Sequence, residues 1–253
     1  ASADPLDSYG LLGTRLATGL ADLGYYVNLF ATGPRDVPHQ DAALRTIIEQ
    51  PIRAALGGIM LGYSTTFDRH NGLTQMGRRI GITMWESSVP PKAFLQPLQE
   101  MDAIITPSTF CKQVFADAGV TTPIHVVPLG VNKLYQPVER TEAGPLTFLA
   151  FIDRGLRKGG PTALQAFIAA FGDDMNYRLI LKGRKSKIEA AILNPYVTLI
   201  QEDYSEDQLY ELYEQCHVLI NPHRGEGFAL LPREFAGTGG ISLTTAWSGS
   251  ADD

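Results

Sequence analysis

The chain has 253 residues with a formal net charge of −6, and 44% of its residues are hydrophobic. This length accommodates one large or two ordinary α/β domains, and the apolar fraction excludes global disorder. The negative charge argues against a protein that coats nucleic acid, and no apolar run approaches the roughly 20 residues of a membrane-spanning helix. The two cysteines, Cys111 and Cys216, form no disulfide framework or metal-ligand set and indicate a reducing, cytoplasmic setting.

The first half of the chain predicts alternating helices and strands. Leu12, Leu16 and Leu20 share one face of an amphipathic helix over residues 10–23. Ser108 is a favourable N-cap for a second helix, which Gly119 ends. Short apolar runs between glycines, prolines and polar residues predict strands over residues 25–30, 58–63, 80–85, 102–106 and 124–127.

The second half repeats this alternation after a break. Residues 136–145 are polar and begin and end near prolines, so we expect a linker there. Helices are predicted over residues 160–171 and 205–216, and strands over residues 146–152, 177–181, 197–200, 218–220 and 241–245. Strands separated by helix-length segments predict parallel sheets covered on both faces. We therefore expect two Rossmann-like domains, residues 1–135 and 146–253, with a cleft between them.

A pair of glutamates eight positions apart, Glu226 and Glu234, is the most informative local feature. Glycines flank the first glutamate, a short apolar strand precedes it, and further glycines follow the second. This order predicts a strand, a loop and a helix whose N-terminal amides can hold an anion. Eight helical residues rise about 12 Å, so the carboxylates would lie on either side of that anion. A nucleoside diphosphate sugar fits, with the sugar at one end and the ribose at the other.

Several motifs in a fixed order carry a family resemblance. They are Thr83–Glu86, Asp102–Ser108, Val127–Asn132, Arg154–Gly159, and Asn221–Phe228 closed by Glu234. The ordered set resembles the retaining glycosyltransferases of family 4, the glycosyl transferases group 1, which have the α/β GT-B fold. The resemblance implies two Rossmann-like domains whose parallel sheets face a central cleft, with residues 1–135 on the acceptor side and residues 146–253 binding the donor. The family's first strand and C-terminal helices are missing here, so we expect a chain truncated at both ends.

The resemblance implies roles for both glutamates. Glu226 is expected to hydrogen-bond the donor sugar, and Glu234 the ribose hydroxyls, for which a carboxylate offers only acceptors. The alternative for Glu234 is a solvated helix residue. Backbone amides are expected to bind phosphate and sugar oxygens at Gly227, Phe228, Ala229, Leu230 and Leu231.

A cationic pair, Arg154 and Lys158, follows a buried strand at the edge of the sheet where open α/β folds bind ligands. In the family such a pair stabilises charge on the leaving diphosphate without a metal. Whether Arg154 or Arg157 partners Lys158 stays open, and a solvated charge cluster is the alternative. The chain has no Asp-x-Asp motif, so we expect neither metal nor cofactor.

Further candidates are weaker. Lys182 is expected near phosphate and Tyr204 near the nucleotide base, although Tyr204 is equally suited to pack against its own helix. Gly10 and Gly13 resemble the end of a glycine loop beside the donor phosphates, or are simple helix-entry glycines. Glu86, where many family members have histidine, is expected on the acceptor side.

The sequence thus predicts transfer of a hexose from a donor such as UDP-glucose or GDP-mannose to the hydroxyl of a glycan, lipid-linked or small-molecule acceptor, in the cytoplasm or at a membrane surface. One alternative is a nucleotide-sugar binding module or inactive fragment, and another is a sugar-nucleotide epimerase of the same fold.

Overall fold

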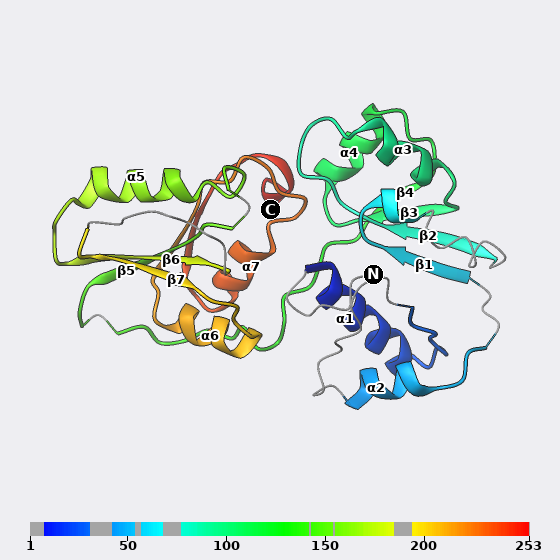
Figure 1. The fold of residues 1–253 in the computed structure, drawn as a ribbon, viewed down its shortest axis with the longest axis horizontal. Coiled ribbons are helices and arrows are strands. Elements are labelled where there is room, and N and C mark those ends of the chain that lie inside the picture. The colour runs from blue at the N-terminus through cyan, green and yellow to red at the C-terminus, as the bar shows by residue number, and fades with distance from the viewer. Residues whose placement is uncertain are drawn as a thin grey trace. The chain divides into compact units, whose positions relative to one another are not determined.

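The protein is described by a computed structural model in which the chain forms two compact units, residues 1–127 and 128–253 (Figure 1). Each unit is an α/β structure built on one parallel sheet. No helix in the described part of the chain is both long and apolar enough to cross a membrane. The described residues are 8–30, 42–53, 57–67, 77–141, 143–153, 155–184 and 194–252.

The first unit is built on a four-stranded sheet, here sheet A, in the order β1-β2-β3-β4 with all neighbours parallel. Its strands are β1 (Gly57–Leu61), β2 (Arg78–Ile82), β3 (Ala103–Thr106) and β4 (Ile124–Val126). Its helices are α1 (Ser8–Asp22), α2 (Ala42–Glu49), α3 (Lys92–Gln99) and α4 (Thr109–Asp117).

Helices pack on both faces of sheet A. Phe94 of α3 and Phe115 of α4 are buried against Ile104 of β3 on one face. Tyr9 of α1 is buried with Leu61 and Ile82 on the other face. A parallel sheet needs this double cover because its strands are apolar on both sides. The predicted parallel α/β arrangement is confirmed for this unit.

One prediction for this unit is wrong, and two of its helices were missed. Residues 25–30 form no strand, and helices α2 and α3 were not predicted. Side-chain hydrogen bonds hold the segment 25–30 instead: Gln50 donates to the carbonyl of Val27, and the Asn28 side chain donates to the carbonyl of Arg53. Helix α3 contains Pro97 and is only eight residues long, so its apolar period is hard to see in the sequence. The predicted proline-containing loop, residues 32–40, lies outside the described residues.

The second unit is built on a five-stranded parallel sheet, here sheet B, in the order β7-β6-β5-β8-β9. Its strands are β5 (Leu146–Phe151), β6 (Tyr177–Gly183), β7 (Val197–Gln201), β8 (Val218–Asn221) and β9 (Ile241–Thr244). Its helices are α5 (Gly160–Phe171), α6 (Glu206–Glu214) and α7 (Leu230–Gly237), with a short 3₁₀ turn, η2, at Ser248–Ser250.

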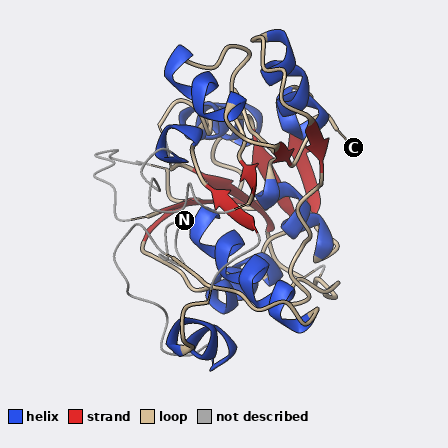
Figure 2. Cartoon of the chain, turned by 90° about the vertical axis from the view of Figure 1, so that its right-hand side faces the viewer, coloured by secondary structure: helices blue, strands red, loops and turns tan. Residues whose placement is uncertain are grey.

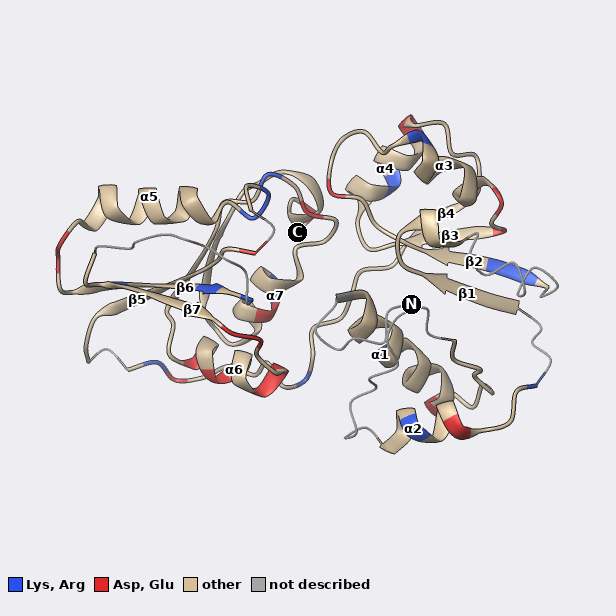
Figure 3. Cartoon of the chain, viewed as in Figure 1, with Lys and Arg blue, Asp and Glu red and all other residues tan. Residues whose placement is uncertain are grey.

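Alternate residues of β5 face opposite helices of the second unit. Phe148 packs with Phe167 of α5, whereas Leu149 packs with Tyr213 of α6 and Phe235 of α7. Helices flank the strands (Figure 2), and α5 carries no charged residue, in contrast to the acidic α6 (Figure 3). The predicted helices and strands of this unit are confirmed in type and order.

Residues just after the unit boundary pack onto the second unit. The amide of Val138 donates to the carbonyl of Thr238, and the Arg140 guanidinium donates to the same carbonyl at 2.7 Å. The boundary between the compact units falls at Val127 and Pro128, while the segment predicted as a linker, residues 136–145, belongs to the second unit.

Candidate active site in the second unit

The order of sheet B marks one position for a ligand. The chain passes from β5 outward to β6 and β7, then returns to place β8 on the other side of β5. Open α/β sheets bind ligands outside the carboxyl ends of the strands where the strand order reverses in this way. In this unit the reversal lies between β5 and β8, which pair at Phe148–Val218 and Leu149–Leu219. The two loops that meet there are residues 152–159 and 222–229.

The two loops are joined by hydrogen bonds to backbone carbonyls. Arg224 donates its amide to the carbonyl of Arg157 at 2.8 Å, and a guanidinium nitrogen of Arg157 donates to the carbonyl of Gly225 at 2.8 Å. Gly159 has a φ of 72°, and a Cβ atom there would lie 2.2 Å from the carbonyl oxygen of Pro222. Only glycine therefore permits this approach.

Glu226 lies between two cations of the other loop. Its Oε1 atom is 2.6 Å from Nζ of Lys158 and 3.3 Å from a guanidinium nitrogen of Arg157. Burial alone would raise the pKa of the Glu226 carboxyl, but the charges of Lys158 and Arg157 outweigh it and hold that pKa below its ordinary value. The carboxylate is therefore ionised and paired. Lys158 and Glu226, both predicted site residues, are brought together, while Arg154 lies outside the described residues.

The main chain of Glu226 is held by η2. Ser248 accepts a hydrogen bond from the Glu226 amide at 2.9 Å, and the amide of Gly249 donates to the Glu226 carbonyl at 2.8 Å. A Cβ atom on Gly249 would lie 2.2 Å from the carbonyl oxygen of Gly227. These residues were not predicted. Their signal in the sequence was the Ser-Gly-Ser run shortly after the predicted strand at residues 241–245. Loops that follow parallel strands lie at the same edge of the sheet.

His223 forms a second contact between the same segments. It is buried, and its Nε2 lies 2.8 Å from the hydroxyl oxygen of Ser250. Burial lowers the pKa of His223, although the nearby Glu226 carboxylate raises it. The imidazole is therefore held in its neutral form and supports the loop that carries Glu226.

Helix α7 begins at Leu230, after an N-cap residue, Ala229, in the left-handed conformation with φ 59°. The N-cap provides no side-chain hydrogen bond to the first turn. Arg233 donates to the carbonyls of Phe228 and Ala229 and stacks over the Phe228 ring. The predicted order of strand, loop and helix is confirmed, but Glu226 lies in the loop, so the helical spacing expected between Glu226 and Glu234 is wrong.

Glu234 lies in the second turn of α7 with only 4% of its surface exposed. It is not a solvated helix residue. Burial raises the pKa of the Tyr213 hydroxyl, and the charge of Glu234 raises it further. Its contact with a ribose stays a prediction.

Comparison with known proteins gives structural likeness without sequence likeness. No family model matches the chain, and no curated protein matches its sequence. Its structure is similar to a sucrose-phosphate synthase from Thermosynechococcus elongatus (TM-score 0.71, 16% identity, 96% of this chain and 77% of that chain). It is also similar to a UDP-forming α,α-trehalose-phosphate synthase from Burkholderia xenovorans (0.61, 13%, 99% and 69%) and to TarM (0.62, 12%, 82% and 45%).

This is the GT-B fold. At these identities the likeness extends to the fold alone, and the chain spans less than half the length of TarM. The parallel sheets A and B predicted from the sequence are those of this fold.

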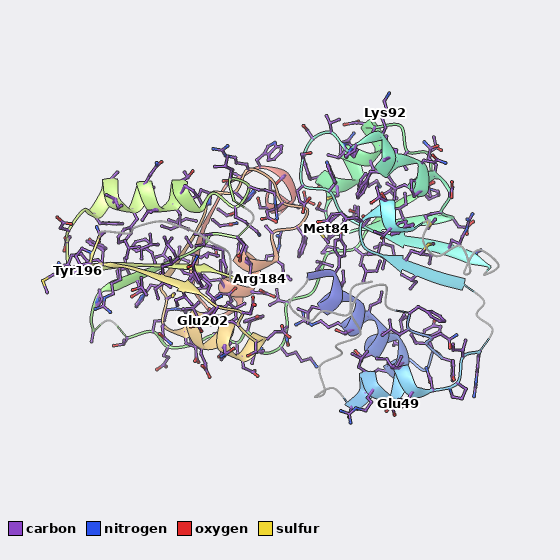
Figure 4. The ribbon with its side chains drawn as sticks, in the orientation of Figure 1. Glu49, Met84, Lys92, Arg184, Tyr196 and Glu202 are labelled. Carbon is purple, nitrogen blue, oxygen red and sulfur yellow. The ribbon has the colours of Figure 1, made fainter. Side chains whose placement is uncertain are left out.

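Two predicted donor-side residues of this GT-B chain contact each other. Nζ of Lys182 lies 4.3 Å from the centre of the Tyr204 ring and donates to the carbonyl of Glu202 at 2.6 Å. Burial lowers the pKa of Lys182. Arg184 and Glu202, labelled in Figure 4, follow β6 and β7, and the Arg184 amide donates to Asp153 of the β5 loop at 2.8 Å. Lys182 and Tyr204 thus connect the end of β6 to the segment that follows β7.

The remaining predicted residues belong to the first unit. Gly10 and Gly13 are buried inside α1, so they lie in a helix rather than in a glycine loop. Glu86 is half-buried a few residues after β2. Within the described ranges, no group of three His, Cys, Asp or Glu side chains could hold a metal ion.

Proposed function

We propose that this protein is a nucleotide-sugar-dependent glycosyltransferase of the retaining family 4 type that transfers a hexose to an acceptor hydroxyl. The observation that carries the proposal is the cluster of Lys158, Arg157 and Glu226 at the reversal point of sheet B. Two cations there suit the diphosphate of a donor, whose negative charge grows as the sugar leaves. Similar structures are described as UDP-forming or contain UDP, which supports a uridine nucleotide.

The donor lies against the α7 end of the second unit in this proposal. Its diphosphate contacts Lys158 and the amides from Gly227 to Leu231, and its ribose hydroxyls contact Glu234. In the same proposal Glu86 lies on the acceptor side, and Gly10 and Gly13 lie beside the donor phosphates. One similar structure contains glucose-6-phosphate, so hexose phosphates are the first acceptors to test. We propose that the reaction needs no metal and takes place in the cytoplasm or at a membrane surface.

Calorimetric titration with UDP, GDP, UDP-glucose and GDP-mannose tests the donor site. Glu234→Gln keeps the size of this buried side chain but removes its charge, and we expect about tenfold weaker nucleotide binding or more, since hydrogen bonds to a charged group contribute about 1.5–3 kcal/mol. Glu211→Gln, on the exposed side of α6, is the control and should bind as the wild type does. Equal nucleotide affinity in Glu234→Gln would refute the ribose contact.

Incubation of the bound donor with hexose phosphates tests the reaction itself. Transfer that persists in EDTA, with the anomeric configuration retained by NMR, is the expected result. Donor binding without transfer to any acceptor would favour the binding-module alternative. The epimerase alternative, which none of the similar structures reported above supports, would be detected as conversion of the donor sugar without acceptor.

A further inference from the structure

The cations of the candidate diphosphate site already have an anionic partner in the protein itself. Lys158 and Arg157 both contact Oε1 of Glu226, at 2.6 Å and 3.3 Å. The three groups come from two loops, with both cations after β5 and the carboxylate after β8. The positive charge that would attract a diphosphate is therefore partly offset by one carboxylate from the facing loop, which leaves the three groups with a net charge of +1.

The two sides of this ion pair differ in their access to solvent. The Glu226 side chain is 9% exposed, whereas those of Lys158 and Arg157 are 15% and 29% exposed. An ammonium group has three donors and a guanidinium group has five, so both cations can contact more than one anion. The two cations are therefore the more accessible side of the ion pair for an anion from solvent.

The backbone at Glu226 is fixed, so any exchange of anions involves the side chain alone. Its amide and carbonyl are bonded to Ser248 and Gly249, and a Cβ atom on Gly249 would clash with Gly227. The exchange therefore requires the Glu226 carboxylate to leave Lys158 by rotation about its side-chain bonds.

We propose that the Glu226 carboxylate is the resident anion of the diphosphate site, which the donor's diphosphate displaces when it binds. This inference rests on the proposed function and adds an exchange step to it. Displacement releases the carboxylate from Lys158 and makes it available as an acceptor for the hydroxyls of the donor sugar. A diphosphate without a sugar displaces the carboxylate but gives it no hydroxyls to bind, so the site favours the intact donor over the free diphosphate.

The consequence is that Glu226 weakens the binding of a bare diphosphate. If the Glu226 carboxylate occupies the site most of the time, the apparent affinity for a diphosphate equals the intrinsic affinity multiplied by the fraction of sites that are open. Glu226→Gln keeps the shape of the side chain and removes the competing charge. We expect inorganic pyrophosphate to bind this variant about tenfold more tightly than the wild type, or better.

Isothermal titration of the whole chain with inorganic pyrophosphate is the test. Glu211→Gln removes one negative charge from the exposed side of α6 in the same unit and controls for net charge; its affinity should stay within about twofold of the wild type. Lys158→Met should bind pyrophosphate more weakly than the wild type. If Glu226→Gln does not fold, Glu226→Ala takes its place as the test variant. In Glu226→Ala the smaller side chain leaves Lys158 and Arg157 partly hydrated.

The outcomes separate this inference from the proposed function. The exchange is supported if Glu226→Gln, and not Glu211→Gln, binds pyrophosphate more tightly than the wild type does. Equal or weaker binding by Glu226→Gln, with Lys158→Met still impaired, overturns the exchange and leaves a diphosphate site in place. If neither pyrophosphate nor UDP binds to any of the four proteins, the exchange and the proposed function both fail.

Discussion

The hydroxyl of Ser248 accepts a hydrogen bond from the backbone amide of Glu226 at 2.9 Å, although 22 residues separate them in the chain. Both residues are buried, so water cannot replace this contact easily. Ser248 also has a φ of 65°, a conformation that L-residues rarely adopt. The position of the Glu226 loop therefore depends on a strained residue in η2.

Substitution of Ser248 separates the hydrogen bond from the strain. Ser248→Ala leaves the Glu226 amide without its partner and should lower the free energy of unfolding by about 1–3 kcal/mol. Ser248→Gly loses the same bond but relieves left-handed strain of about 1–2 kcal/mol, so it should be the more stable variant. Urea unfolding of both variants measures this. An alanine variant as stable as the wild type would show that the bond contributes nothing to stability.

His223 should make stability depend on pH. Its pKa in the folded protein lies below its ordinary value of 6.5, chiefly because of burial. As pH falls through this ordinary value, the unfolded chain takes up a proton at His223 before the folded chain does, so stability decreases. We expect the free energy of unfolding to be lower at pH 5.5 than at pH 8 because of this residue.

The control for this effect is His223→Gln, which retains a polar group beside Ser250 but does not titrate. Urea midpoints at the two pH values should differ less in the variant than in the wild type, since all other ionisable groups are unchanged. An identical pH dependence in the two proteins would mean that His223 does not titrate differently on unfolding.

Gly159 and Gly144 provide a matched pair for testing the contact between the β5 and β8 loops. Both have positive φ values, 72° and 101°, but a Cβ atom clashes with Pro222 only at Gly159, and Gly144 has open space around it. Gly144→Ala should cost about 1–2 kcal/mol of stability from strain alone. Gly159→Ala should cost more than about 4 kcal/mol, in the range of the most severe core changes. Similar losses in thermal unfolding would show that the loops can separate without penalty.

The two cysteines should be inert in the folded protein. Cys111 and Cys216 are both fully buried, and burial raises the pKa of the Cys216 thiol to about 12. Thiolate is the reactive form, so neither residue should react with a thiol reagent such as DTNB at pH 8. In denaturing urea both should react at once, giving two thiols per chain. Rapid labelling of one thiol in the native protein would locate a local opening.

The sequence predicted the α/β alternation well because buried parallel strands and their covering helices leave strong local signals. The strands β5 and β8 and the helices α5 and α6 were all recognised in this way. The segment 25–30 was misread because its apolar residues suggested a strand, whereas the Gln50 side chain and the backbone amide of Arg53 hold it by hydrogen bonds. Local composition cannot show which groups will pair with a backbone.

The candidate site was recognised in its parts but not in its connections. Lys158 and Glu226 were assigned separate roles, on a diphosphate and on a sugar. Their direct ion pair depends on β8 lying beside β5, a consequence of strand order that no local pattern contains. Ser248 was missed for the same reason, since its importance comes only from the loop it faces.

The strand order of sheet B also bears on when the site forms during folding. The contacts that join its two loops link residues 68 positions apart, such as Arg157 and Gly225. Between them in the chain lie β6, β7 and α6. Non-local pairings of this kind close long loops and are slow to form. We therefore expect β5, β6 and β7 to associate first, and the ion pair of Glu226 to mature only with the last strands, so that its formation marks a completely folded second unit.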